Sequence, residues 1–391
     1  MRKVLLGTST LVGAGLVATA SIHPAAAADA IKLSVGGFFK TAYMVNFDDD
    51  GEGELGNDTN TDGFFSDSEI YFRGSTVLDN GLEVGARVEL EGETDGDQID
   101  EAWVFFSGGF GEIHIGSEDE ALANNCILPP GGTGNFSAFS PNQWGANTLT
   151  SNTACTGVDS FSPDRGDAQK ILYVTPSFAG FQVGLSYTPS AGDESHVQTG
   201  GPHVGMPVNV DDESRHNVSL YATYSYEGDG WGLTWGGGAS FEGHVEQANG
   251  AQDREESDFY QTGLNLSFGN FAIGGAFEYF NDFASFDGSN GGNEQDGDFW
   301  VAGAGMSYSF DPFTVGVQYS HQDRDIDVEN VDNSELTLDR IVLTGNYAMG
   351  PGIAIDGEIG YTWQDVKGPE FDEGADNYDS LEIGIGTNFT F

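Results

Sequence analysis

The feature that most constrains the fold is a strict alternation of apolar and polar residues, repeated along most of the chain. The last segment, residues 381–391, shows it most clearly. One face carries Leu381, Ile383, Ile385, Thr387, Phe389 and Phe391, and the other carries Glu382, Gly384, Gly386, Asn388 and Thr390. A period of two residues is typical of a β-strand with one apolar face, whereas an amphipathic helix repeats about every 3.6 residues.

The same pattern recurs in about 16 segments, and in nearly all of them the charged residues keep to one parity. Short connections such as residues 79–81 and 350–352 alternate with long acidic ones such as residues 48–63 and 192–213. Tight turns at one end and long polar loops at the other are typical of a barrel that spans an outer membrane. The sequence therefore predicts an all-β, transmembrane, antiparallel β-barrel with about 16 strands, short periplasmic turns and long extracellular loops.

A soluble β-sandwich also alternates, because its two sheets bury their apolar faces against each other. Three features favour lipid instead. The apolar faces are nearly free of charge, the inner faces carry many glycines and charges, and aromatic residues such as Trp231, Trp300, Tyr308 and Trp363 gather near strand ends. Aromatic girdles at the two membrane interfaces account for the third feature.

The composition agrees with this interpretation and excludes one class of partner. With 13 Lys and Arg against 62 Asp and Glu, the formal net charge is -49, so the chain lacks the basic surface that binds nucleic acid. Hydrophobic residues make up only 38% of the chain, yet aromatics reach 12%, too many for a disordered acidic chain. A barrel explains both, because only one face of each strand meets lipid.

Residues 1–28 have the features of a secretory signal peptide, since Arg2 and Lys3 precede an apolar stretch that ends in small residues at 26–28. Cleavage after Ala30 fits nearly as well. We expect residues 29–391 to form one transmembrane barrel domain. No other segment has the roughly 18 consecutive apolar residues of a membrane helix.

Two cysteines, Cys126 and Cys155, permit one disulfide in an exported chain. A zinc site would need further ligands nearby, so the disulfide is the favoured interpretation.

Three stretches resemble the trimeric porins of the Gram-negative outer membrane, particularly the α-proteobacterial type. They are residues 110–116 (FGEIHIG), residues 173–181 (YVTPSFAGF) continuing to Ser186 and Tyr187, and the final strand ending in Phe391. Similar porins often carry a basic residue after the position of Gly116, where this chain has Ser117. The resemblance implies 16 strands, a homotrimer, and a third long loop at about 117–167 that folds into the lumen as a constriction.

The loop expected inside the lumen contains both cysteines. Because a loop inside a water-filled barrel has no apolar core, we expect the Cys126–Cys155 bridge to stiffen it. The resemblance further implies a location in the bacterial outer membrane, with outer-membrane lipid and lipopolysaccharide as partners.

Charged residues in the lumen give candidates for the constriction, because the narrowest point of a channel sets its selectivity. Lys40, Arg73 and Arg87 lie on the inward parity of the first three strands, where we expect them side by side, and Lys170 projects inward beyond the loop. The loop begins with Glu118, Asp119 and Glu120. Similar porins set a basic wall against acidic loop residues, which implies a transverse field. Alternatively, these charges are solvated lumen residues without a specific role.

A metal site is weakly indicated. Asp58, Asn60, Asp62, Gly63 and Glu69 match the spacing of an EF-hand calcium loop, but that motif needs a helix on each side. A loose calcium site in the loop, with Asp58, Asn60 and Asp62 as ligands, is more plausible, and we expect no required cofactor.

The sequence thus predicts a channel for passive diffusion of small hydrophilic solutes and ions, with a preference for cations because of its acidic charge. It predicts no enzyme, since the seven His residues show no catalytic arrangement. One alternative is a substrate-specific channel for sugars or a cationic nutrient. Another is a soluble acidic protein that binds or hydrolyses a polymer.

Overall fold

The computed structural model describes residues 30–48, 60–92, 99–139, 168–190, 214–245, 255–282, 285–287, 294–329, 333–369 and 377–391. The signal peptide expected at residues 1–28 lies outside this part. Helical structure in the described residues is one 3-10 turn, Ala123–Asn125, and nothing helical among them has the length and hydropathy of a membrane span.

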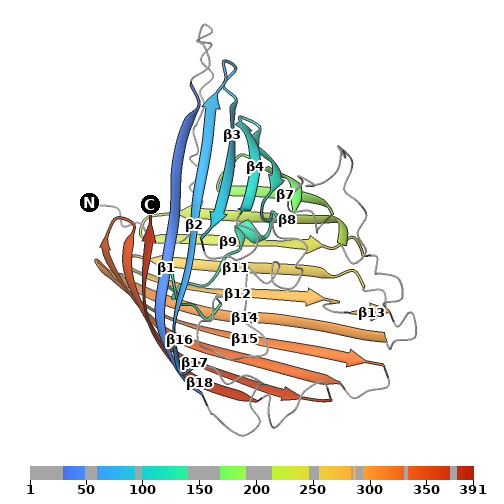
Figure 1. Ribbon diagram of the computed structural model, residues 1–391, viewed down its shortest axis with the longest axis vertical. Helices are drawn as coiled ribbons and strands as arrows, with labels where there is room; N and C mark the ends of the chain where they lie inside the picture. Colours follow the sequence, from blue (N-terminus) through green and yellow to red (C-terminus); the bar gives the residue numbers. More distant parts are fainter. Residues whose placement is uncertain are drawn as a thin grey trace.

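All named strands of the described chain belong to one sheet (Figure 1). They are β1 (Lys32–Asp48), β2 (Asp62–Val77), β3 (Glu83–Glu91), β4 (Ile99–Gly108), β5 (Gly111–Ser117), β6 (Gln169–Val174), β7 (Phe181–Ser190), β8 (Ser214–Glu227), β9 (Trp231–Phe241), β10 (His244–Val245), β11 (Asp258–Phe268), β12 (Phe271–Asn281), β13 (Phe286–Asp287), β14 (Glu294–Phe310), β15 (Phe313–Val328), β16 (Ser334–Gly350), β17 (Ile353–Lys367) and β18 (Tyr378–Thr390).

The sheet closes on itself. β10 and β13 are two residues long and only extend the sheet beside β8 and β14, which leaves sixteen long strands among the described residues. Successive long strands pair antiparallel, and β1 pairs with β18, for example Phe39 with Phe389. The sixteen-stranded barrel predicted from the alternation is confirmed.

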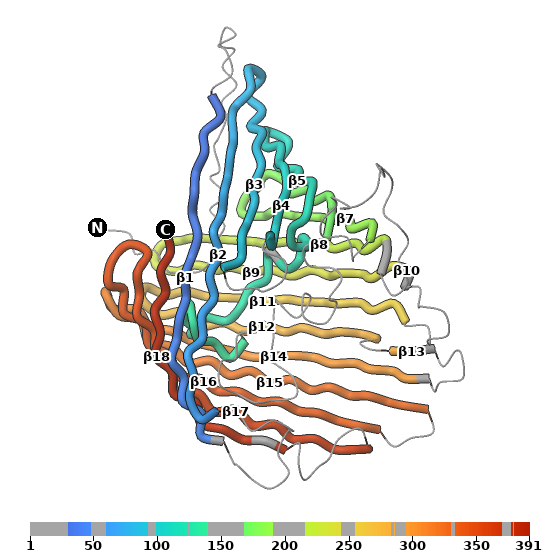
Figure 2. The backbone as a smooth tube through the Cα atoms, in the orientation of Figure 1, coloured from blue at the N-terminus to red at the C-terminus, as the bar shows by residue number. Residues whose placement is uncertain are grey.

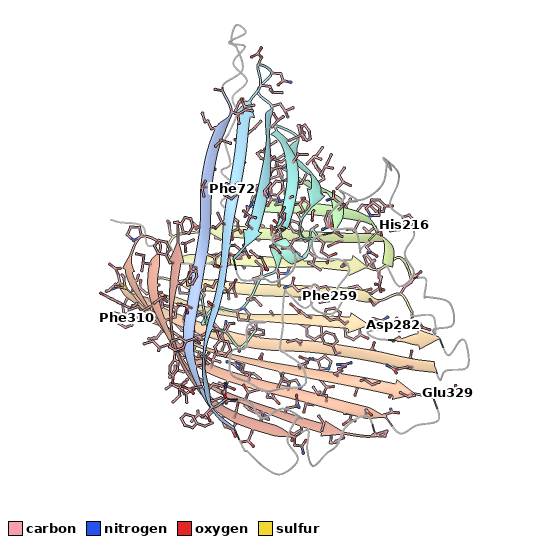
Figure 3. The ribbon with its side chains drawn as sticks, in the orientation of Figure 1. Phe72, His216, Phe259, Asp282, Phe310 and Glu329 are labelled. Carbon is pink, nitrogen blue, oxygen red and sulfur yellow. The ribbon has the colours of Figure 1, made fainter. Side chains whose placement is uncertain are left out.

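The two ends of the barrel differ. Short turns such as residues 78–82 and 228–230 join strands at one end, where Gly81 and Gly230 adopt φ values of 82° and 85° that glycine tolerates without strain. Figure 3 labels Phe310 at this end, and Asp282 and Glu329 at the other, where the long connections begin. Much of those long connections lies outside the described residues.

Strand parity sorts the side chains as predicted. On β16 and β17, Leu343 and Ile359 are 56% and 51% exposed on the outside of the barrel. Their neighbours along the two strands, Val342 and Glu358, are buried inside. An apolar outer face and a polar inner face are typical of a barrel surrounded by lipid.

The third long connection enters the barrel, as predicted. In Figure 2 its described part, residues 118–139, passes across the inner faces of β9, β11 and β12. The wall holds its backbone with side chains from several strands: Asn265 donates to the Leu128 carbonyl (2.8 Å), and Gln318 donates to that of Pro129 (2.7 Å). Farther along, the Asn135 amide donates to Asp356 (2.8 Å).

This loop has an apolar core after all. Leu122 and Phe139 of the loop are buried against a wall cluster that includes Phe259, Phe280 and Phe299. Phe136 packs in a second cluster with Ala42 and Met44. The expectation that the loop has no core of its own is therefore wrong, because some inward positions carry apolar side chains that pair with apolar residues of the loop.

Glycines on the inner wall let the loop approach this closely. A Cβ at Gly305 would overlap the carbonyl oxygen of Pro130, and one at Gly263 would overlap that of Ile127. The loop thus lies on a glycine seat, defined as Gly263 and Gly305 together with Gly316, which meets Gly131 in the same way. Part of the unusual glycine content has this steric cause.

Candidate functional site

The inner wall has a covered side and an open side. Behind the loop, inward polar residues are almost fully buried, for example Glu278 and Ser320 at 0% exposure. On β1 to β3 the inward basic side chains stay partly exposed, with 26% for Lys40 and 48% for Arg73. Water therefore reaches this part of the wall, and we define the open wall as the inward faces of β1 to β4 around Lys40, Arg73 and Arg87. Farther along β1, Phe136 of the loop covers Ala42 and Met44.

Two of the three bases expected side by side are neighbours. The β2–β3 register places Arg73 directly opposite Arg87. Lys40 pairs in register with Asp67, whereas the β1 partner of Arg73 is Ser34. Six residues of strand separate Ser34 from Lys40, about 20 Å. The structure thus brings Arg73 and Arg87 together and places Lys40 apart from them.

Each of these bases has an acidic partner on the same wall. Lys40 Nζ lies 3.2 Å from Asp67, an Arg73 nitrogen lies 3.5 Å from Glu83, and Arg87 is paired with Glu89. Their charges are therefore largely offset within the wall itself.

Aromatic rings beneath the bases fix them further. Lys40 lies over Phe38 at 4.2 Å, while Arg73 lies over Phe105 and Arg87 over Tyr71, both at 4.4 Å. A cation over a ring face is attracted by the negative face of the ring, so these contacts hold the bases flat against the wall.

Carboxylates remain in surplus on the open wall. Oxygens of Glu69, Glu89 and Asp100 lie within 4.8 Å of one another, and Glu101 follows directly on β4. Glu89 of this group is paired with Arg87. Acidic side chains therefore outnumber basic ones among the described residues of the open wall.

The acids at the start of the loop serve as anchors to the wall. Glu118 is buried, with Oε2 2.7 Å from Nδ1 of His114, whose Nε2 lies 2.6 Å from Glu112. The imidazole stacks on Trp103 at 4.1 Å. A protonated ring, with two N–H donors, satisfies both carboxylates. Glu118 is thereby tied to β5.

The next acids of the loop are held in the same way. The backbone N–H of Asp119 donates to Glu101 (3.0 Å), and buried Glu120 accepts a hydrogen bond from Ser240 (2.7 Å). Lys170 is also buried, and its ammonium donates to the Ala168 carbonyl (2.8 Å). A role for these residues in setting the constriction stays a prediction.

The sequence analysis missed a buried charge cluster on β16 to β18. Arg340 is 2% exposed and lies 2.9 Å from Glu358 and 3.4 Å from Glu382, and it also donates to Thr362 (3.2 Å). A signal was available, because Arg340 shares the inward parity of Val342 in a chain with 13 basic residues. What parity cannot supply is the register that brings two carboxylates to it.

The remaining candidates give no assembled site. Cys126 is disulfide-bonded, while Cys155 lies outside the described residues. Of the expected calcium ligands, Asp58 is also outside them, Asn60 is exposed, and Asp62 accepts a hydrogen bond from Tyr43. A second carboxylate cluster, of Glu255, Asp282 and Asp296, lies at the long-loop end.

One histidine–carboxylate pair lies on the outer face. His321 Nδ1 is 2.8 Å from Asp339, an arrangement also found in hydrolases. The residue opposite His321 on β14 is Ala302, which offers no nucleophile.

The sequence profile of the Gram-negative porins matches residues 12–367. No curated protein sequence gives a significant match.

Three solved structures illustrate the likeness in fold. The anion-selective porin from Comamonas acidovorans is 17% identical, with a TM-score of 0.56 over 93% of this chain and 100% of that one. The trimer form of the Vibrio cholerae outer membrane protein OmpT is 13% identical, with a TM-score of 0.57 and the same coverage. The outer membrane channel DcaP of Acinetobacter baumannii is 12% identical, with a TM-score of 0.55 over 95% and 100%.

Proposed function

The chain belongs to the Gram-negative porin family, and on that premise we propose that it lets small hydrophilic solutes and ions diffuse passively across the bacterial outer membrane, with a preference for cations. Family and fold indicate an outer-membrane channel rather than an enzyme. The preference for cations is the finer part of the proposal, and it rests on the charges of this chain alone, since one similar porin is anion-selective.

The observation that carries the preference is the acid surplus of the open wall. Lys40, Arg73 and Arg87 are each offset by a carboxylate, so they attract few anions. A carboxylate attracts a monovalent cation by about 1 kcal/mol at 4 Å in water, roughly a fivefold local enrichment before screening by salt. Several such groups along one path favour cations over anions.

The test is the reversal potential in a KCl gradient across a planar bilayer. We expect a sign that corresponds to cation preference, and a smaller value for Glu69→Gln combined with Asp100→Asn. Glu335→Gln is a matched control, because Glu335 is half-exposed at the long-loop end, beside Lys367 and away from the open wall. Anion preference in the wild-type channel would refute the proposal.

The cluster of stacked phenylalanines inside the barrel does not support a sugar-specific channel. Phe280 stacks on Phe299 at 4.2 Å and contacts Phe259 at 4.2 Å, but all three are buried between loop and wall. A passing solute cannot reach them, so the general diffusion channel is the better proposal.

We propose that three copies associate through the outer faces of β1 to β6. Large exposed side chains there are mostly aliphatic or Phe, such as Leu33, Ile70, Val104 and Ile115, whereas every Trp on the outer face of the described chain lies on β9 to β17. Interfacial Trp gathers where lipid and water meet, so an arc without outward Trp among the described residues is the part of the outer face least typical of a lipid boundary. Heat-dependent mobility on SDS gels and native mass spectrometry test the trimer.

Lipopolysaccharide and a loop-bound calcium ion remain further proposals. The acidic character of the long connections suits divalent cations, which also bridge anionic lipid headgroups. Calorimetric titration of calcium into the chelator-treated protein, with Asp58→Asn and Asp62→Asn as variants, tests the loop site. Unchanged calcium binding in both variants would remove Asp58 and Asp62 from it.

A further inference from the structure

A groove of about 860 Å3 lies on the outer wall of the barrel, across β9, β11, β12, β14 and β15. These strands lie side by side in Figure 1. Small residues form the floor, because the register sets Gly275 directly opposite Ala304 and places Ala302 two residues along β14. Large side chains stand on both flanks, Leu264 beside Gly275 and Tyr319 beside Ala304. The groove is thus a gap in an otherwise bulky outer surface.

The outward residues of β14 show where the groove lies along the membrane normal. From the long-loop end they are Trp300, Ala302, Ala304, Met306 and Tyr308. Trp300 and Tyr308 belong to the aromatic girdles that mark the two membrane interfaces. The floor residues follow directly after Trp300, so the groove lies in the extracellular half of the lipid-facing surface.

The rim carries one oriented polar group. His321 lines the groove, its ring is 4.9 Å from that of Trp300, and its Nδ1 is 2.8 Å from Asp339. Asp339 also accepts a hydrogen bond from Tyr319, so the carboxylate is held from two sides. Since Nδ1 is engaged, Nε2 is the ring atom left to meet a ligand at the rim.

We propose that this groove binds an acyl chain of an outer-leaflet lipid, with His321 Nε2 hydrogen-bonded to the carbonyl or hydroxyl at the head of the chain. The groove is open toward the surrounding bilayer, so an acyl chain can enter it from the side. Its walls are mostly hydrocarbon and aromatic, and the hydroxyl of Thr262 in the lining is engaged with the Gly236 carbonyl. His321 lies beside the interfacial Trp300, where the polar end of a chain belongs.

The competing occupant is a second copy of the chain. Two features disfavour it. Trp and Tyr, including Trp235, Trp300 and Tyr319, surround the groove, as expected of a surface at a lipid–water boundary. The arc of β1 to β6, with its aliphatic and Phe surface, is a better match for protein contact.

Quenching of tryptophan by brominated lipid tests the proposal, because Trp235 and Trp300 line the groove and bromine quenches only on contact. The folded protein in detergent micelles is titrated with phosphatidylcholine whose chains carry bromine near their midpoint. The signal of the two residues is the difference between wild type and the variant with Trp235→Phe and Trp300→Phe. Ala304→Leu fills the floor, whereas Gly345→Leu adds the same side chain elsewhere on the outer wall, where a Cβ meets open space.

We expect saturable quenching at one or a few lipids per chain in wild type and Gly345→Leu, and its loss in Ala304→Leu. His321→Phe should raise the lipid concentration at half-quenching, and His321→Gln should restore it in part. Quenching that rises without saturation and alike in all variants would overturn the proposal. So would Trp residues that are protected in the oligomer and quenched only in the monomer, because a second copy would then cover the groove. The reversal potential of Ala304→Leu should equal that of wild type, so this test is independent of the selectivity proposal.

Discussion

Removing the charge of Arg340 should destabilise the barrel far more than removing an exposed charge. Arg340 lies at 2.9 Å and 3.4 Å from two carboxylates that are themselves buried, and a third polar bond goes to Thr362. Arg340→Met leaves Glu358 and Glu382 together inside the protein without a cation. Loss of one partner from a buried ion pair costs about 3–5 kcal/mol. With a urea dependence of roughly 2–3 kcal/mol per molar, the unfolding midpoint should fall by about 1–2.5 M.

The assay is reversible urea unfolding in lipid vesicles, followed by tryptophan fluorescence and by heat-dependent gel mobility. Lys367→Met is the matched control, because Lys367 and Glu335 form a pair of similar length, 3.0 Å, with both side chains at least half exposed. Solvent screens such a pair, so we expect no measurable shift of the midpoint.

Two further variants separate charge from packing. Arg340→Lys keeps the charge but cannot reach both carboxylates, and it should fall between wild type and Arg340→Met. Adding Glu358→Gln and Glu382→Gln to Arg340→Met should recover most of the loss, since no unpaired charge then remains. Equal shifts for Arg340→Met and Lys367→Met would refute the reasoning.

Three other predictions concern the loop, the open wall and the long-loop end. Gly305→Val should displace the loop from its seat, because the new side chain overlaps the Pro130 carbonyl. Single-channel conductance should therefore change. Gly345→Val, on the outer face, is the control and should leave the conductance unaltered. Asp67→Asn frees Lys40 and should move the reversal potential toward anions, while Arg87→Gln should move it the opposite way; shifts of the same sign would contradict the pairing. Burial and the nearby Asp298 raise the pKa of Asp282 above its ordinary value of 3.8, so the folded state binds the extra proton and local stability should fall as pH rises from about 4. Hydrogen exchange at the end of β12 measures this, and Asp282→Asn should remove the dependence.

The sequence could predict the barrel because the period of two is visible without any knowledge of strand pairing. The parity of residues 381–391 alone assigns Ile383 to the outside and Glu382 to the inside, and both assignments agree with the structure. Alternation and connection length together also predict the number of strands and the difference between the two ends.

Contacts between strands could not be predicted, because the alternation within one strand does not determine its pairing register with the next. Parity put Lys40 and Arg73 on the same wall, but the register set Lys40 against Asp67, distant from Arg73. The course of the loop was equally hidden, since residues 118–139 have no period that could reveal Leu122 and Phe139 as core residues. The contact of Glu118 with His114 was hidden for the same reason, because a loop has no strand parity from which its partners could be predicted.

The glycine seat links two parts of the gene that are far apart. Gly263, Gly305 and Gly316 belong to three different strands, yet each accommodates the backbone of a loop encoded more than a hundred residues earlier. A loop transplanted from another channel would meet hollows shaped for a different path, and a barrel grafted onto this loop would collide with it. Efforts to retune the pore by exchanging loops should therefore exchange the facing wall positions in the same step, and natural variation at the two should be correlated.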